Sequence, residues 1–190
     1  MLYAIYPRKS QNYLIFSYEN SINYFIFDEE RKIEPDEVKI VYELLDKNKY
    51  SHLGRADFIF TNGPVLVSDK VKDILEDEIE RGFVQFFNIE IINCDKEFKL
   101  FAMYIIHQEN VTNLDESIYE LEDDDFEFDI QILKIKFDWD LTIAKSKEVP
   151  FQIVINDDIK DRFLNNNINN VNLYSKIDSF NDKNSEFIKL

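Results

Sequence analysis

The sequence contains very little glycine, cysteine or histidine, and each shortage excludes a kind of chemistry. Three glycines in 190 residues are too few for almost every phosphate-binding loop, because such loops use several glycines to bring the backbone close to the phosphate. One cysteine and two histidines exclude a disulfide framework and any Cys/His zinc site built by this chain alone. These shortages remove most enzyme classes and name no function.

Basic residues are also scarce. The chain has 22 Lys and Arg against 38 Asp and Glu, which gives a formal net charge of −16. Because phosphate backbones and anionic lipids are bound through basic side chains, we expect neither nucleic acid nor a membrane as a partner. A basic protein is the natural complement, since opposite charges speed encounter. The alternative is that the acidity only keeps the protein soluble.

The sequence does contain enough apolar residues for a folded domain. Hydrophobic residues make up 45% of the chain, which excludes a disordered chain despite the charge. No run approaches the ~20 apolar residues that span a bilayer. Residues 1–7 have neither a basic leader nor a small-residue cleavage site, and the lone Cys94 suits a reducing compartment. We therefore expect a cytoplasmic protein with a single domain over residues 1–190.

Short runs of Tyr, Phe and Ile predict strands along much of the chain. In the first third, residues 2–6, 13–18 and 22–27 form such runs, and the last two are close enough in sequence to form a hairpin. Residues 98–107 are largely apolar, and residues 126–132 alternate between apolar and polar side chains, which is typical of a strand with one wet face. The runs together predict a mostly antiparallel sheet.

The segment after the predicted hairpin favours a helix that starts at Pro35. Its apolar residues recur at i, i+3, i+4 and i+7 and would lie on one helix face. They are Val38, Val41, Tyr42 and Leu45. The helix is expected to end near residues 47–49, where two lysines suit the C-terminal dipole.

The clearest local pattern is a strand–cap–helix–glycine–strand unit. Apolar runs at 58–60 and 65–67 predict two strands, and Ser68 then stands where a helix N-cap is expected. Apolar residues at helical spacing follow, and Gly82 is placed to end the helix. Residues 83–92 predict the next strand.

A similar unit lies near the C-terminus. Residues 151–155 predict a strand, Asn156 can cap the helix that follows, and the sequence 157–161 resembles 69–73. The match is either an internal repeat or the convergence of two ordinary capped helices. Since both helices follow strands in the same manner, we expect both to pack on one sheet. The predicted fold class is α+β, a mostly antiparallel β-sheet with about three helices packed on it.

No motif in the sequence marks a catalytic or metal site. Neither His52 nor His107 lies near a nucleophile in a recognisable motif, and the acidic neighbour Asp95 makes Cys94 a poor nucleophile. Residues 123–125 are three carboxylates, but the loop lacks the glycine of a calcium-binding EF-hand. We expect no enzymatic activity, no catalytic residue, no metal site and no cofactor.

An acidic segment is the most unusual feature of the chain. Between Lys99 and Lys134 there is no Lys or Arg, while ten residues are Asp or Glu. Acidic residues with aromatic neighbours form a plausible anchor and rim for a basic partner. The bland alternative is a solvated loop leading into a strand. The expected partner-binding residues are Asp115, Glu116, Tyr119, Glu120, Glu122, Asp123, Asp124, Asp125 and Phe126.

The two strand–cap–helix units also resemble a known family. The segments that carry the resemblance are 57–59, 64–75, 84–91, 151–155 and 159–161. They are similar to a bacterial family of uncharacterised domains assigned as immunity proteins of polymorphic and contact-dependent toxin systems. The resemblance covers roughly residues 57–174. The family's usual ending, a Thr-Gly pair leading into a Phe, is replaced here by Asn169-Asn170-Val171.

The resemblance implies a non-enzymatic inhibitor that binds a cognate toxin domain, and it supplies no catalytic residues. It also suggests a division into N-terminal strands and a helix (1–56), an immunity-like region (57–175) and a frayed tail (176–190). Two other functions stay open: a structural or scaffold module of a phage or secretion system, and a carboxylate-based metal-dependent enzyme. A homodimer through an exposed edge strand is a further form of association that so strand-rich a chain allows.

Overall fold

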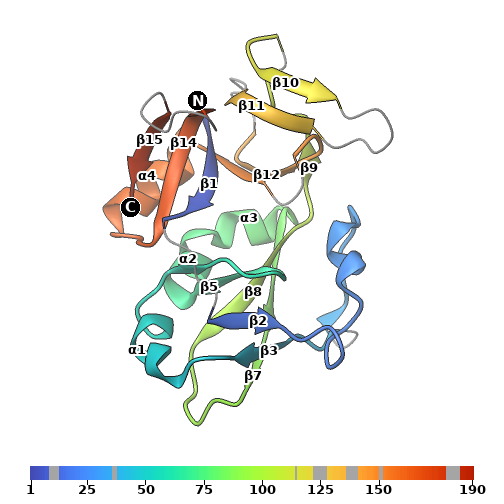
Figure 1. The fold of residues 1–190 in the computed structure, drawn as a ribbon, viewed down its shortest axis with the longest axis vertical. Coiled ribbons are helices and arrows are strands. Elements are labelled where there is room, and N and C mark those ends of the chain that lie inside the picture. Colours follow the sequence, from blue (N-terminus) through green and yellow to red (C-terminus); the bar gives the residue numbers. More distant parts are fainter. Residues whose placement is uncertain are drawn as a thin grey trace.

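A computed structural model describes residues 1–8, 13–35, 38–113, 115–121, 128–135, 141–149, 152–178 and 185–190. Within these ranges the protein has fifteen strands in three sheets and four α-helices (Figure 1). Neighbouring strands are antiparallel in all but two of the described pairs. The predicted α+β class with mostly antiparallel sheets is therefore confirmed.

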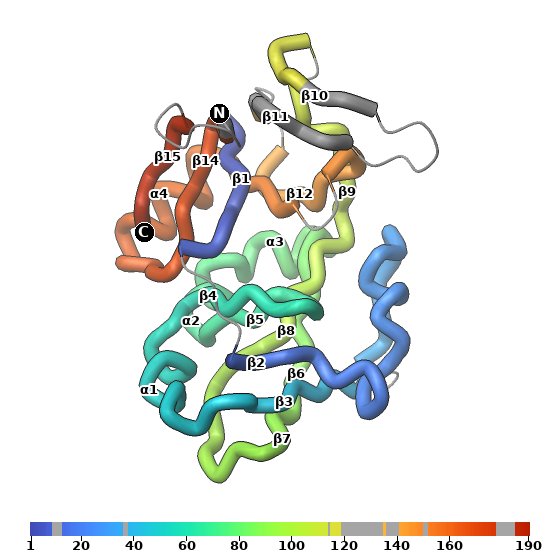
Figure 2. The backbone as a smooth tube through the Cα atoms, in the orientation of Figure 1, coloured from blue at the N-terminus to red at the C-terminus, as the bar shows by residue number. Residues whose placement is uncertain are grey.

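The largest sheet joins the two ends of the sequence. Strand β1 (Leu2–Pro7) lies between β13 (Ile153–Asn156) and β14 (Val171–Asp178), and both chain ends lie in this upper part of the molecule (Figure 2). The sheet also contains β9 (Gln108–Glu109), β10 (Ile118–Leu121), β11 (Phe128–Lys134), β12 (Ile143–Ser146) and β15 (Glu186–Lys189). The suggested division of the chain at residue 56 would separate β1 from its sheet neighbours β13 and β14. The suggested tail, residues 176–190, contains β15, which pairs with β14.

The middle of the chain forms the two smaller sheets. The four-stranded sheet has the order β4 (Phe58–Ile59), β5 (Val65–Ser68), β8 (Leu100–Ile105) and β6 (Val84–Asn88). The three-stranded sheet has the order β2 (Leu14–Phe16), β3 (Val41–Leu44) and β7 (Glu90–Ile92). The residues predicted as one strand at 83–92 therefore belong to two strands, β6 and β7, in different sheets.

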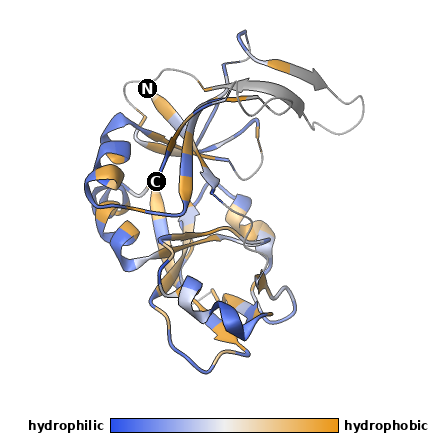
Figure 3. Cartoon of the chain, turned by 60° about the vertical axis from the view of Figure 1, so that its left-hand side comes forward, coloured by the Kyte–Doolittle hydropathy of each residue, from blue (hydrophilic) through white to orange (hydrophobic). Residues whose placement is uncertain are grey.

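The four-stranded sheet is a central layer that is covered on both faces. Along β8, Ala102 and Tyr104 belong to the core shared with the three-stranded sheet, whereas Met103 belongs to the core shared with the eight-stranded sheet. Leu66 and Val67 of β5 divide in the same way. Because successive strand residues face opposite sides, a strand buried on both faces needs a continuous apolar run. Figure 3 shows hydrophobic residues concentrated in the strands.

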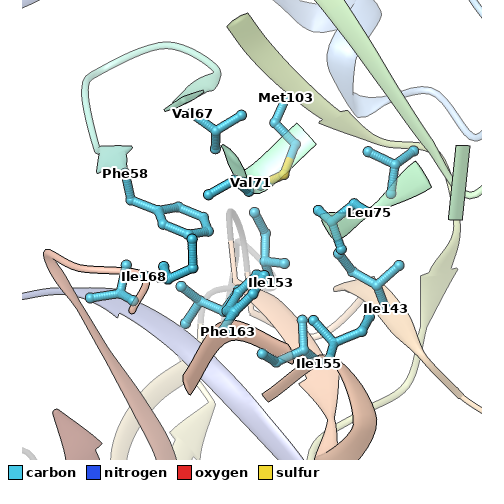
Figure 4. Close-up of a cluster of buried hydrophobic side chains, with 14 of the residues drawn as sticks. Phe58, Val67, Val71, Leu75, Met103, Ile143, Ile153, Ile155, Phe163 and Ile168 are labelled. Atoms are coloured by element: carbon cyan, nitrogen blue, oxygen red, sulfur yellow. The ribbon is translucent and has the colours of Figure 1, made fainter. Parts of the chain in front are cut away.

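Three short helices line the core between the central and the eight-stranded sheet: α2 (Asp69–Ile74), α3 (Glu76–Glu80) and α4 (Asp157–Asn165). Phe58 and Phe163 meet edge to face in this core with ring centroids 5.7 Å apart, and Figure 4 shows their neighbours pointing toward one another. The expectation that both capped helices pack on one sheet is wrong. Helix α2 follows β5 and α4 follows β13, which belong to different sheets, and the two helices contact each other.

The local features predicted for the two units are present in part. The single helix expected between Ser68 and Gly82 is divided at Leu75 into α2 and α3. The Asn156 side chain accepts a hydrogen bond from the Ile159 amide at 3.0 Å, so it caps α4 as expected. Gly82 has φ +76°, the left-handed conformation that favours glycine after a helix. Ser68 precedes α2 but makes no side-chain cap bond. Its hydroxyl donates instead to Asp57.

Two predictions for the first third of the chain are wrong. Residues 22–27 do not form a hairpin with β2. They contain the 3₁₀ helix η1 (Tyr24–Asp28), and β2 pairs with β3 instead. The helix expected from Pro35 is also absent over the described residues 38–45, since β3 occupies this segment. A β3 buried on both sides carries adjacent apolar residues, which imitate helical spacing, whereas Leu45 is 55% exposed.

The chain turns after β3 instead of ending a long helix. A 3₁₀ turn, η3 (Lys47–Lys49), leads directly into the short helix α1 (Tyr50–Leu53). The Asp46 side chain accepts from the Asn48 amide at 2.9 Å and begins this turn. The two lysines thus stand at the start of a helical segment rather than at the end of one.

Candidate functional site

Residues 115–121 of the acidic segment lie at the β10 end of the eight-stranded sheet. Asp115 and Glu116 are exposed in a turn, which is held by the Ser117 hydroxyl donating to the Asn113 carbonyl at 2.7 Å. Strand β10 follows, and its first residue, Ile118, is 51% exposed. The first two expected partner-binding residues are therefore placed on the surface beside an exposed apolar side chain.

Strand β10 forms an edge hairpin with β11. In its register Tyr119 lies opposite Ile130, and Glu120 lies opposite Asp129. Among the described strands β10 ends its side of the sheet. The remaining expected partner-binding residues, Glu122, Asp123, Asp124, Asp125 and Phe126, lie outside the described residues.

A second surface, which was not among the predictions from the sequence, surrounds η1. Phe25 is 72% exposed and Tyr18 is 57% exposed. Tyr24 stands between them, with ring centroids 6.3 Å from Tyr18 and 6.5 Å from Phe25. The Asn23 side chain caps η1 by accepting from the Phe25 amide at 3.2 Å. We call Tyr18, Tyr24 and Phe25 the aromatic surface.

An apolar cleft of about 250 Å³ opens beside the aromatic surface. Tyr24 lines it, and the hydroxyl of Tyr18 donates to the carbonyl of Asn62 at its edge at 2.9 Å. Burial raises the pKa of Tyr24, and the nearby charge of Asp28 raises it further. The apolar walls of the cleft are formed by Phe27, Phe60, Val65, Met103, Ile105 and Ile153.

Ion pairs and hydrogen bonds fix the end of η1 and the residues that follow it to the eight-stranded and the four-stranded sheets. Lys145 of β12, which also lines the cleft, lies 2.5 Å from the carboxylate of Asp28. The Gln108 amide side chain of β9 donates to the Asp28 carbonyl at 3.0 Å. The Tyr104 hydroxyl of β8 donates to the carbonyls of Glu29 and Arg31. The aromatic surface therefore rests on a firmly held segment.

Buried carboxylates elsewhere have structural partners. Glu78 of α3 is 1% exposed and accepts from the Thr142 hydroxyl at 2.6 Å, while Arg162 of α4 donates to it at 3.5 Å. Because a buried charge is costly unless it is paired and hydrogen-bonded, these contacts account for Glu78. They also connect α3, α4 and the start of β12.

Asp57 is the second buried carboxylate, at 5% exposure. It accepts from the Ser68 hydroxyl at 2.8 Å and from the Asn169 side-chain amide at 2.7 Å, and Lys70 lies 2.9 Å away. Asn170, which follows Asn169, has φ +74°. Glycine adopts this left-handed conformation most easily, and asparagine tolerates it. Asn169 and Asn170 thus form a turn with a left-handed residue, and their side chains bond to Asp57 and to the carbonyl of Phe58 in β4.

Little in the described part of the chain suggests catalysis. The imidazole of His107 stacks on Phe83 with ring centroids 4.8 Å apart, and His52 is exposed on α1. The Cys94 thiol donates to the Lys96 carbonyl at 3.2 Å. No group of three His, Cys, Asp or Glu side chains among the described residues could hold a metal ion.

Neither the models of known protein families nor the curated proteins gave a match to this chain. Its class is therefore defined by fold and surface alone: an acidic α+β protein of three sheets, with an aromatic surface beside an apolar cleft. No helix in the described ranges is long and apolar enough to cross a membrane.

A sequence signal for the aromatic surface did exist. Four large apolar residues, 24–27, stand without alternation between Asn23 and three acids, which does not fit a half-wet strand.

Proposed function

We propose that this protein is a non-enzymatic immunity protein that neutralises a basic bacterial toxin domain by binding it. The observation that carries the proposal is the aromatic surface: Phe25 and Tyr18 are 72% and 57% exposed on a chain with a net charge of −16. Exposed aromatic residues dominate binding energy in protein interfaces. An excess of negative charge favours basic partners and disfavours acidic ones.

The acidic segment has a complementary role in this proposal. Asp115 and Glu116 place two exposed negative charges just before the β10–β11 hairpin. Many toxin domains act on nucleic acid and are basic, so this charge would steer them toward the protein and raise the association rate. In Figure 1 the η1 segment lies at the right-hand edge of the molecule, and strands β10 and β11 lie at its top. One partner could contact both.

The test is co-expression with the toxin domain encoded beside this gene, scored by rescue of growth and by isolation of the complex. We expect Phe25→Ala to weaken the complex by about 2 kcal/mol, or roughly 30-fold in Kd. Its effect on the stability of the free protein should stay within about 0.5 kcal/mol, because the side chain is exposed. Titration calorimetry or a surface-binding assay of the purified pair measures the Kd. Urea unfolding measures the stability of the free protein.

The matched control is Leu164→Ala. Leu164 is 41% exposed on α4, on the opposite side of the view in Figure 1 from η1, so its truncation should leave the Kd unchanged.

Equal Kd values for the Phe25 variant and the wild type would remove the aromatic surface as the anchor. Absence of growth rescue and of any complex would reject the immunity function. Neighbouring phage structural genes would favour a scaffold module, and metal retained through purification a metal-dependent enzyme.

A further inference from the structure

The cleft beside the aromatic surface has a size that suits one side chain. Its volume of about 250 Å³ exceeds the ~150 Å³ cavity that accepts benzene. It is smaller than the ~300–1,000 Å³ pockets that enclose drug-sized ligands and cofactors. A single large apolar group fits such a space, whereas a nucleotide-sized cofactor does not.

The walls of the cleft are preformed by elements from both halves of the molecule. Phe27 comes from η1, Val65 from β5, Met103 from β8 and Ile153 from β13. The last three are strands whose neighbours are held in the sheets, so the cleft needs no rearrangement to exist. A preformed apolar pocket at the centre of an interface is the usual position of a binding hot spot.

The charge around the mouth identifies the kind of occupant. Residues 18–30 contain four acidic residues and no Lys or Arg. The carboxylate of Asp28 is paired with Lys145 at the cleft wall, and this pair leaves no excess positive charge there to attract an anionic ligand. An occupant that carries negative charge would also be repelled by the chain as a whole, at −16.

We infer that the cleft receives one aromatic or aliphatic side chain from a basic segment of the toxin, as the central anchor of the complex. The inference rests on the proposed function and deepens it, because it states which feature of the partner is recognised. The exposed rings of Tyr18 and Phe25 would then surround the inserted side chain and exclude water from it.

The cleft can be tested without any partner, using toluene as a probe of an apolar side chain. Toluene added to the wild-type protein should shift the methyl NMR signals of Met103 and Ile153. Val65→Phe, which places a larger side chain in the wall, should abolish these shifts, and the milder Val65→Leu should weaken them. Unchanged methyl signals in the wild type at toluene saturation would overturn the inference.

The role in the complex is then tested with the toxin. Val65→Phe should raise the Kd at least about tenfold, mainly through faster dissociation, whereas Ile91→Phe, at a half-buried strand position outside the cleft, should not. A Val65→Phe variant that is folded and binds the toxin like the wild type would overturn the anchor while leaving the immunity function intact. Failure of the wild type to bind the toxin would overturn both, so the two failures are distinguishable.

Discussion

Gly63 is the position at which a single added atom would disturb the most. A Cβ built there would lie 2.6 Å from the side chain of Phe16, closer than atoms in proteins can approach. Phe16 cannot easily move, because it is 2% exposed and packs edge to face against Tyr18, Tyr24 and Tyr42. The turn before β5 therefore requires glycine for its lack of a side chain, not for an unusual φ.

We expect Gly63→Ala to lower the free energy of unfolding by about 1–3 kcal/mol, since overpacking forces the surrounding side chains to shift. Gly54→Ala is the matched control. A Cβ at Gly54 would meet the Phe98 ring at an ordinary 3.6 Å, and its backbone is helical, so this change should be neutral or stabilising by up to about 1 kcal/mol. Urea unfolding of the two variants gives the comparison, and equal stabilities would contradict it.

The structural roles of some single residues could be predicted from the sequence, and those of others could not. Gly82 and Asn156 were identified because helix ends have strong local residue preferences. Ser68 stood at the expected cap position, yet its hydroxyl bonds to the buried Asp57. The requirement at Gly63 was hidden, because it depends on Phe16, which is distant in the sequence.

Among the elements, α4 shows how a helix terminus is attached to a neighbouring strand. Asp157 in its first turn accepts from Lys160 at 2.6 Å and from the Tyr3 hydroxyl of β1 at 3.1 Å, and the Met1 amino group also contacts it. The Lys160 bond is the main reason that the pKa of Asp157 falls from 3.8 to about 2. The charged carboxylate thus helps to hold α4 against β1.

This lowered pKa predicts a pH dependence of stability. A carboxyl group with a folded pKa below its unfolded value stabilises the protein above the unfolded pKa, and the contribution is lost as pH falls through the folded value. The stability difference between the wild type and Asp157→Asn should therefore be largest above pH ~5, shrink as the pH falls, and level off only below the folded pKa, near pH ~1. Because the side chain is 47% exposed, we expect less than about 1 kcal/mol. Urea unfolding across this range measures the difference, and a constant value would contradict the prediction.

The elements that sequence patterns predicted wrongly are those whose partners are distant in the sequence. Strand β3 was expected to be helical, because the apolar residues at 38, 41, 42 and 45 recur at helical spacing. Burial between layers makes both of its faces apolar, and the Tyr42 hydroxyl reaches the Pro64 carbonyl at 2.6 Å. Helices α2 and α4 were recognised because the spacing of their apolar residues, and the Asn156 cap of α4, are local features.

At the scale of the whole molecule, the excess negative charge opposes the compact state. A chain at −16 repels itself, and its described ion pairs are mostly exposed on at least one side, where each is worth little. The apolar cores shared between the layers must overcome this repulsion.

We therefore expect salt to stabilise this protein. Raising the ionic strength from about 0.01 M to about 0.15 M shortens the Debye length from roughly 30 Å to 8 Å, which screens repulsion over the surface more than it weakens short ion pairs. The Tm measured by calorimetry should rise over this range, and a neutral solute at equal osmolality serves as the control. A falling Tm would show that the ion pairs outweigh the repulsion.

The sequence by itself determined the net charge, the α+β class and the starting points of α2 and α4, because these follow from composition and from residues a few positions apart. The basic partner stays a prediction. Only the tertiary structure decided that α2 and α4 follow strands of different sheets, and that the end of β1 lies beside strands from the other end of the chain. It alone placed Tyr18 and Phe25 on the surface beside a cleft, since exposure depends on contacts between residues far apart in the sequence. Asp28 meets Lys145 in this way, and no local pattern records such a contact.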